Sequence, residues 1–255
     1  MKGGNAIDLT GRVAIVTGGT RGLGKDIAAA LAQAGCAVVV CGRNAPAELP
    51  DGVSFVAADI REPDQARALV DHTIAAHGRL DILVNNAGGS PTVEAARASP
   101  RFFDSILKLN LHAPMYMAQA AYPHMVAAGG GNVINIASVS GIRPSPGTAA
   151  YGAAKAGLLN LTQSLAQEWG PQGVRVNAII AGLMQTETAD LTYGDAQAQA
   201  EVGRSMPLGR MGTGSDIAGA VLWLCSDLAS WVSGARINVD GGGERPYFLD
   251  LVKGN

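Results

Sequence analysis

The sequence predicts an α/β fold with a single doubly wound parallel sheet of about seven strands and helices on both faces. Short β-branched runs alternate with longer amphipathic stretches along the chain. The short runs are continuously apolar, which is typical of strands buried on both faces of a parallel sheet. The 34 glycines are scattered, which suits many tight turns between strands and helices. No linker-like stretch interrupts the pattern, so residues 1–255 are predicted to form one domain.

The expected elements follow the chain in βα order. The expected strands are Val13–Thr17, Ala37–Cys41, Ser54–Ala57, Ile82–Asn85, Asn132–Ala137, Arg175–Ile180 and Ile237–Val239. The expected helices are Gly22–Ala34, Pro63–His77, Phe102–Ala128, Ala150–Trp169, Asp195–Arg204 and Ser215–Cys225. Between Cys41 and Val53 two prolines disfavour a full helix, so a loop or a single turn is expected there.

Composition excludes several classes of function. The formal net charge is −2, with no basic excess that would favour nucleic acid. No apolar run approaches the roughly 18–20 residues of a membrane span, and the first residues lack the apolar core of a signal peptide. The three cysteines are interpreted as reduced core thiols, which predicts a cytoplasmic location. The four histidines show no metal-ligand spacing, so no metal site is expected.

A glycine-rich turn follows the first expected strand and precedes the first expected helix. It reads Thr17-Gly18-Gly19-Thr20-Arg21-Gly22-Leu23-Gly24. Glycine permits positive φ and lets backbone amides approach a diphosphate, while the helix N-terminus offers free N–H groups to the anion. The turn therefore predicts a dinucleotide site, with an unliganded glycine-rich turn as the alternative.

The spacing of these glycines, and the motifs after them, resemble the short-chain dehydrogenase/reductase family from about Leu9 to Gly243. The turn is similar to that family's TGxxxGxG motif, and Asn85-Asn86-Ala87-Gly88 to its NNAG motif. Ile180-Ala181-Gly182 stands where the family usually has Pro-Gly. The resemblance implies a Rossmann-like fold, with Asp59 at the adenine and Thr186 at the nicotinamide carboxamide. The cofactor-binding residues it implies are Gly18, Thr20, Arg21, Gly22, Leu23, Gly24, Arg43, Asp59, Ile60, Asn86, Ala87, Gly88, Tyr151, Lys155, Ala181, Gly182, Met184 and Thr186.

The same resemblance implies a catalytic set of Asn110, Ser138, Tyr151 and Lys155. Reduction of a carbonyl needs a hydride on carbon, which the cofactor supplies, and a proton on oxygen. Lys155 lies one helical turn after Tyr151, so its charge and that of the nicotinamide are expected to lower the pKa of Tyr151 towards neutrality. Ser138 is expected to donate to the substrate oxygen. By resemblance, Lys155 also holds the nicotinamide ribose and Asn110 a water that links the lysine to solvent.

The end of the second strand bears on which nicotinamide is used. An acidic residue there normally binds the 2′-hydroxyl of NAD, whereas an arginine accommodates the NADP phosphate. This strand ends Val40-Cys41-Gly42-Arg43-Asn44, with no acid. Arg43, helped by Arg21 in the turn, therefore favours NADP(H) over NAD(H).

The substrate is expected to bind at loops beyond the carboxyl ends of the strands. Residues 183–208 are predicted to form a lid, and apolar residues in it favour a mainly apolar substrate such as a 3-oxoacyl thioester or a steroid- or terpene-like ketone. Those residues are Leu183, Met184, Leu191, Tyr193 and Met206. Ser140, Arg143, Leu183 and Tyr193 are the candidate substrate contacts, with a solvated side chain as the alternative for Arg143.

The sequence also bears on the oligomeric state and on the class of reaction. The resemblance implies a homotetramer that packs through Phe102–Ala128 and Ala150–Trp169. A C-terminal tail, residues 241–255, carries Tyr247, Phe248 and Leu249, which are predicted to pack on a neighbouring subunit. The predicted activity is hydride transfer between NAD(P)(H) and a secondary alcohol or ketone. The alternatives are a nonenzymatic dinucleotide-sensing or scaffold protein, and a lyase or epimerase on the same fold.

Overall fold

Seven parallel strands form one sheet in the computed structural model, which describes residues 7–246 and 252. The strands are β1 (Val13–Thr17), β2 (Ala37–Gly42), β3 (Val53–Ala57), β4 (Ile82–Asn85), β5 (Gly131–Ser138), β6 (Val174–Ala181) and β7 (Arg236–Val239). Their order across the sheet is β3-β2-β1-β4-β5-β6-β7. The order reverses between β1 and β4, which is where such sheets bind ligands beyond the carboxyl ends of the strands. The predicted fold class is confirmed.

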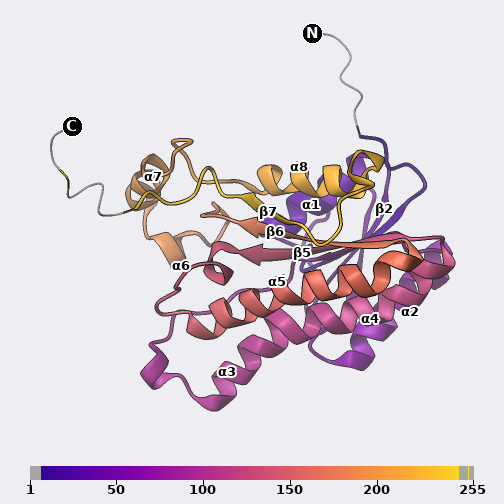
Figure 1. The fold of residues 1–255 in the computed structure, drawn as a ribbon, viewed down its shortest axis with the longest axis horizontal. Coiled ribbons are helices and arrows are strands. Elements are labelled where there is room, and N and C mark those ends of the chain that lie inside the picture. Colours follow the sequence, from indigo (N-terminus) through magenta and orange to yellow (C-terminus); the bar gives the residue numbers. More distant parts are fainter. Residues whose placement is uncertain (1–6, 247–251, 253–255) are drawn as a thin grey trace, which may run out of the picture.

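Helices cover both faces of the sheet (Figure 1). On one face lie α1 (Gly22–Gln33) and α8 (Gly214–Cys225), and on the other α2 (Pro63–His77), α4 (Ala113–Ala127) and α5 (Ala149–Trp169). Each layer encloses its own apolar core, because β1 and its neighbours are buried on both sides. This explains why the strands lack polar alternation.

The long helix expected over Phe102–Ala128 is divided in the structure. It consists of α3 (Pro100–Leu107), a π-helical turn (Lys108–His112) and α4. Asn110 lies within the π-helical turn, and its side-chain amide donates to the carbonyl of Ile106 at 3.0 Å. That carbonyl would otherwise accept the i+4 backbone N–H of an α-helix, so the side chain competes with the helical ladder at this point.

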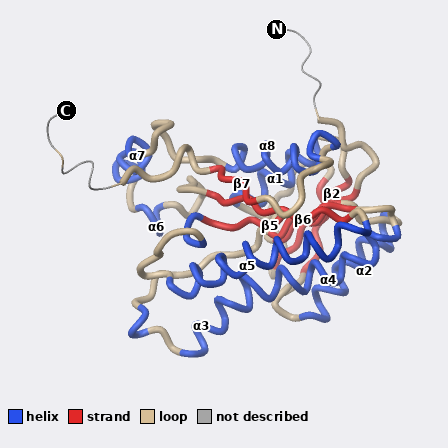
Figure 2. The backbone as a smooth tube through the Cα atoms, in the orientation of Figure 1, coloured by secondary structure: helices blue, strands red, loops and turns tan. Residues whose placement is uncertain are grey.

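The chain beyond β6 contains two short helices, α6 (Asp190–Tyr193) and α7 (Ala196–Ser205). The helix expected at Asp195–Arg204 is thus present as α7, with Asp195 as its cap, because the Asp195 carboxylate accepts from the Ala198 amide at 2.9 Å. The tube in Figure 2 shows both helices at the end of the molecule from which the described chain leaves towards its C-terminus. Residues 43–52 contain no helix, as expected from their prolines.

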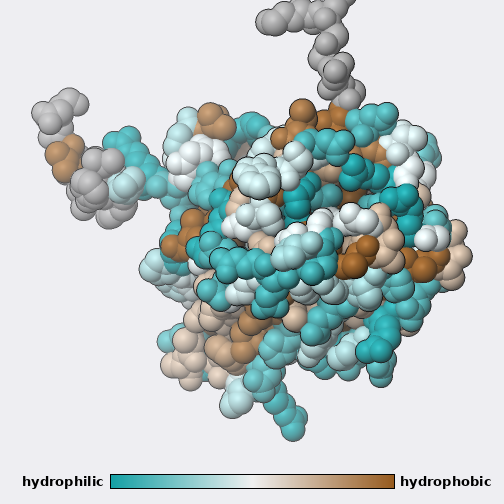
Figure 3. Space-filling view, turned by 45° about the vertical axis from the view of Figure 1, so that its right-hand side comes forward, coloured by the Kyte–Doolittle hydropathy of each residue, from teal (hydrophilic) through white to brown (hydrophobic). Residues whose placement is uncertain are grey.

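The surface carries small separate groups of apolar residues between hydrophilic ones on the face that Figure 3 displays. The three cysteines are free and buried, as expected of core thiols. Burial raises the pKa of Cys36 and Cys41 to about 11 and that of Cys225 to about 12. No helix in residues 7–246 combines the length and the apolar character that crossing a membrane requires.

Candidate active site

The glycine-rich turn connects β1 to α1 and cannot accept side chains at its key positions. Gly18 has φ +63° and Gly22 φ +54°, which favour glycine. A Cβ at Gly24 would lie 2.4 Å from the Gly18 carbonyl oxygen, closer than any real contact. The turn is thus held open by missing side chains, and it leads into α1, whose first N–H groups have no carbonyl partner within the helix. These features fit a dinucleotide, whose diphosphate needs such backbone donors.

Thr17 joins this turn to the segment after β4. Its hydroxyl accepts from the amides of Asn86 and Ala87, at 3.0 and 3.1 Å, and donates to the Val84 carbonyl. The Asn86 side chain in turn donates to the carbonyls of Thr17 and Gly18. These hydrogen bonds bring the glycine turn and the NNAG motif together in space. Sequence analysis did not single out Thr17, because its partners lie about 70 residues away in the sequence.

Glu187 is a second residue that sequence analysis missed. One of its carboxylate oxygens accepts from the backbone N–H of Gly22, the first residue of α1, at 3.1 Å. Its backbone hydrogen bonds, including this one, and the nearby Lys25 and Arg21 lower the pKa of Glu187. The carboxylate thus occupies a helix N-terminus that attracts anions. The neighbouring Thr186 also lies close to Gly22, and its contact with the nicotinamide carboxamide stays a prediction.

At the predicted adenine end of the site lie Asp59, which is ion-paired, and Arg43, which is exposed. Asp59 accepts from the Arg61 guanidinium at 2.8 Å, and this hydrogen bond lowers the pKa of Asp59. Ile60 beside it is buried. Arg43 is exposed at the end of β2 and contributes to the lowered pKa of Asp59, so these two residues lie near one another. Thr20 lies against Gly42, which brings the glycine turn to the same place.

Ser138, Tyr151 and Lys155 meet where β5 ends and α5 begins. Burial raises the pKa of Tyr151, and a hydrogen bond with Ser138 opposes that shift. The Lys155 ammonium nitrogen donates to the Ile136 carbonyl at 2.8 Å and lies 5.5 Å from the centre of the Tyr151 ring. Lys155 is 3% exposed, and burial lowers its pKa to about 8.

The direction found for Tyr151 differs from the lowering expected when cofactor is bound. Desolvation of the buried phenol is the largest cause of the raised pKa, and the Ser138 hydrogen bond opposes it only in part. The lowering of the Tyr151 pKa in the presence of cofactor stays a prediction.

Asn110 and Gly88 complete this cluster. A Cβ at Gly88 would lie 2.7 Å from the Asn110 carbonyl oxygen Oδ1 and 3.2 Å from the Lys155 nitrogen, so the three residues converge. Asn110 is fully buried, and its amide accepts from the Gly89 amide and donates to the Gly89 carbonyl. Its side chain therefore fixes the loop after β4. The water link expected from the resemblance stays a prediction.

The end of β6 closes the site from the other side. A Cβ at Gly182 would lie 2.6 Å from the Asp240 Cα, so the glycine is needed although alanine replaces the usual proline before it. Ala181 is buried and pairs with Ser138 across the sheet. Met184 is 8% exposed and bridges to Gly212.

The four candidate substrate residues lie in different environments. The Ser140 hydroxyl accepts from Ser145 at 3.0 Å, and both serines lie against Gly152, next to Tyr151. Tyr193 is partly buried and within electrostatic reach of Tyr151. Leu183 lines a cavity of about 280 Å³ with Met184 and Met206.

Arg143 is partly exposed but ion-paired in the structure. Its guanidinium pairs with Glu244 of the C-terminal tail and donates to that carboxylate at 2.7 Å. Leu191, expected to line the substrate site, is 82% exposed. The tail residues Tyr247, Phe248 and Leu249 lie outside the described residues.

Comparison with known proteins agrees with this geometry. A family model described as Enoyl-(Acyl carrier protein) reductase matches residues 18–244. The chain belongs to the short-chain dehydrogenase/reductase family. It is 38% identical over 93% of its length to 2-dehydro-3-deoxy-D-gluconate 5-dehydrogenase of Escherichia coli (strain K12), covering 97% of that protein. It is 36% identical over 92% of its length to 3-oxoacyl-[acyl-carrier-protein] reductase FabG of Chlamydia muridarum, covering 98% of it.

A solved structure leads to the same family. The aldohexose dehydrogenase of Thermoplasma acidophilum, in its ligand-free form, superposes with a TM-score of 0.87 at 30% identity, over 92% of this chain and 95% of that one. The relatives are NAD(P)-dependent dehydrogenases and reductases that act on alcohol or keto groups. The chain is therefore an oxidoreductase of this family. In residues 7–246 and 252, no group of histidine, cysteine, aspartate and glutamate side chains is arranged to hold a metal ion.

Proposed function

We propose that this protein transfers a hydride between NADP(H) and a secondary alcohol or ketone, with Tyr151 as the acid/base. The observation that carries the proposal is the meeting of Ser138, Tyr151 and Lys155 beside the glycine turn. A dinucleotide-sensing protein has no need of a buried phenol between a hydroxyl donor and an ammonium group. The nicotinamide, when bound, supplies or accepts the hydride.

The residues have distinct tasks in this proposal. Ser138 donates to the substrate oxygen as negative charge develops there. Tyr151 delivers the proton to that oxygen during reduction and removes it during oxidation. Lys155, held by the Ile136 carbonyl, keeps positive charge beside the phenol and favours its ionised form. Asn110 holds the loop that carries Gly88 and Gly89 in place.

NADP(H) is favoured over NAD(H) because of the charges near the end of β2. Arg43 is exposed there, next to the glycine turn, and Asp59 is already paired with Arg61. A 2′-phosphate would therefore meet an available guanidinium. Arg43→Asp is expected to weaken NADPH binding far more than NADH binding, as measured by fluorescence titration. An equal loss for both cofactors would contradict the preference.

For the substrate we propose a ketone with an apolar portion. Leu183, Met184 and Met206 give the cavity beyond β6 an apolar part that favours such a portion, beside the charged Arg210, Asp216 and Asp240 of the same lining. Polar groups also lie near the start of α5 and beside the C-terminal tail. They are the hydrogen-bonded pair Ser140 and Ser145 and the ion pair Arg143 and Glu244. A hydroxylated or acidic oxo compound is therefore the second class to include in the substrate panel.

We further propose that residues 183–208 close over the bound substrate and that residues 241–255 form a tail. A homotetramer formed through α4 and α5 is proposed from the family resemblance. A cytoplasmic location is proposed because the three thiols are free and buried.

The test is oxidation of NADPH and of NADH over a panel of 3-oxoacyl thioesters, cyclic ketones and polar oxo acids. Tyr151→Phe is run beside the natural protein and is expected to lower turnover at least about a hundredfold while cofactor binding persists. Tight cofactor binding without turnover of any ketone or alcohol would favour a sensor. Conversion of substrate without net change in cofactor absorbance would favour a lyase or epimerase.

A further inference from the structure

A second cavity, of about 870 Å³, lies at the amino edge of the sheet, opposite the active site. Its lining includes Arg12 before β1, Asp81 before β4, Asn132 in β5 and Arg175 in β6. Ser138 of the active site stands at the other end of β5, about 20 Å away at ~3.3 Å per residue. The volume is that of a typical small-molecule site, but the cavity does not belong to the site already described.

Two of its charged groups form a closed structural pair. The Arg79 guanidinium binds the Asp81 carboxylate through two nitrogens, at 2.6 and 2.9 Å. Asp81 also accepts from the Val13 amide at 2.9 Å, and its side chain is 7% exposed. This pair fixes the starts of β1 and β4, so it is not available to a ligand.

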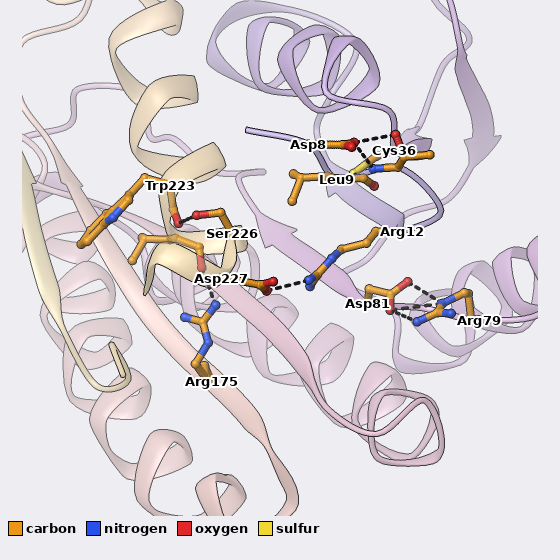
Figure 4. Close-up of polar contacts among 12 residues, drawn as sticks. Asp8, Leu9, Arg12, Cys36, Arg79, Asp81, Arg175, Trp223, Ser226 and Asp227 are labelled. Carbon is orange, nitrogen blue, oxygen red and sulfur yellow. Dashed lines mark hydrogen bonds and ion pairs between the residues drawn. The ribbon is translucent and has the colours of Figure 1, made fainter. Parts of the chain in front are cut away.

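Arg12 is differently placed, because its carboxylate partner is exposed. Arg12 pairs with Asp227 at 3.0 Å through a single nitrogen, and the Asp227 side chain is 95% exposed. Figure 4 shows Arg12 and Arg175 on either side of Asp227. A single contact to so exposed a carboxylate is weak and exchanges easily with another anion.

Arg175 has no carboxylate partner within ion-pair distance in the part of the chain that the structure describes. Its two terminal nitrogens donate to the backbone carbonyls of Val232 and Leu224, at 3.0 and 2.6 Å. Burial lowers the pKa of Arg175, and the charge of Arg12 acts in the same direction. The cavity lining carries three arginines, Arg12, Arg79 and Arg175, and two aspartates, Asp81 and Asp227, so positive charge exceeds negative charge there.

Asn132 supplies the independent observation that points to a ligand. The residue is 4% exposed and lines the cavity, yet its side-chain oxygen Oδ1 has no hydrogen-bond partner in the structure. Buried polar atoms without a partner are rare and costly. The oxygen is itself shielded from solvent. Rotation of the Asn132 amide about χ2 turns this acceptor towards the cavity, where a ligand hydroxyl can donate to it.

We propose that this cavity binds a small organic anion that also carries a hydroxyl group, such as a sugar phosphate or a sugar acid. The anionic group takes the place of Asp227 between Arg12 and Arg175, and the hydroxyl donates to Asn132. Trp231, which is 99% exposed, lies at the same cavity and reports occupancy.

The first experiment titrates the cofactor-saturated protein with glucose 6-phosphate and with gluconate, following tryptophan fluorescence and the heat of binding. Saturable binding of either probe is expected, and the better probe identifies a phosphate or a carboxylate as the preferred anion. Trp231→Phe is expected to remove the fluorescence change and keep the heat. Absence of saturable heat with both probes would overturn the proposal.

Charge variants then separate this site from general attraction of anions. Asp227→Asn removes the competing carboxylate and is expected to tighten binding about fivefold. Arg12→Gln is expected to weaken it about tenfold or more. Arg67→Gln, an exposed arginine on α2, is the matched control and should leave affinity unchanged. Equal weakening by Arg12→Gln and Arg67→Gln, or unchanged affinity in Asp227→Asn, would overturn the proposal.

A last variant tests the hydroxyl. Asn132→Leu removes the acceptor, so affinity for glucose 6-phosphate should fall while affinity for sulfate, which has no hydroxyl at neutral pH, should not. A purely structural role for Asn132 would change both affinities alike, and that result would contradict the hydroxyl contact. Circular dichroism and thermal melting of each variant confirm that it is folded before its affinity is compared.

Discussion

At the carboxyl edge of the sheet uncharged side chains hold the backbone of the glycine turn and of the loop after β4, whereas at the amino edge an ion pair joins the starts of two strands. Thr17, Asn86 and Asn110 bind these backbone groups at the carboxyl edge, where the ion pairs of Asp59 with Arg61 and of Arg143 with Glu244 also lie. At the amino edge Arg79 and Asp81 join the starts of β1 and β4. This difference indicates that uncharged side chains hold the backbone where the charged cofactor is predicted to bind. Such side chains do not compete with the negative charge of the cofactor.

Gly24→Ala is expected to have the largest effect, because it disturbs the glycine turn at the carboxyl edge. The new Cβ would lie 2.4 Å from the Gly18 oxygen and 2.5 Å from the Asn86 side chain, so the turn must move. Cofactor affinity is expected to fall about a hundredfold, with about 1–3 kcal/mol of lost stability. Fluorescence titration and urea unfolding measure the two effects. Gly219→Ala in α8, where a Cβ meets nothing within 4 Å, is the control. Unchanged binding in Gly24→Ala would refute the assigned role of the turn.

Because the Lys155 ammonium is buried, the free energy of unfolding is expected to depend on pH. Its pKa is about 8 in the folded protein and 10.5 as the reference value. Between these values the unfolded chain binds more protons, so the unfolding free energy rises with pH by at most about 1.4 kcal/mol per unit. Below pH 8 both states are protonated and this contribution is flat.

Lys155→Met provides the comparison that isolates this effect. The raised pKa values of Tyr151 and the three cysteines oppose the rise at high pH in both proteins, so the difference between wild type and variant is the quantity to measure. Urea unfolding at pH 7 and pH 9.5 should show that wild type gains stability relative to Lys155→Met. Parallel curves would mean that Lys155 is not buried as a cation.

Asp81→Asn tests the amino edge. The amide oxygen can still accept from Val13, but the carboxylate charge opposite Arg79 is lost. Because Arg79 is half exposed, we expect a loss of about 1 kcal/mol in the free energy of unfolding. Cofactor affinity should stay the same, since the pair lies at the other end of the strands. A parallel loss of affinity would show that the two edges are coupled.

Glu187→Gln is expected to give the smallest effect and the opposite sign. The Glu187 carboxylate accepts from Gly22 at the N-terminus of α1, where the diphosphate is predicted to bind. Neutralising it removes a competing negative charge, so NADPH affinity should rise about threefold. Glu201→Gln on the exposed side of α7 serves as the control. Weaker binding in Glu187→Gln would instead assign this carboxylate a role in holding the site closed.

The strands were predictable because most of them are apolar runs between turn signals, although the edge strands β3 and β7 are partly exposed, and the bounds agree within a residue or two. The π-helical turn was not predictable, although it lies in the expected helix at Phe102–Ala128. It depends on the hydrogen-bond partners of the Asn110 side chain. Motif resemblance proposed Ser138, Tyr151 and Lys155, which the structure brings together. Thr17 and Glu187 act through contacts distant in sequence, about which local pattern carries no information. The partner of Arg143, Glu244, was missed for the same reason.

The three buried cysteine thiols can report the unfolding of the protein. Cys36, Cys41 and Cys225 lie at most 5% exposed in two layers of the core, with pKa values of about 11 to 12. At neutral pH the reactive thiolate is nearly absent in the folded state, so alkylating reagents should label these sites only when the chain opens. Cysteine labelling followed by mass spectrometry would then time the opening of each side of the sheet without any engineered probe.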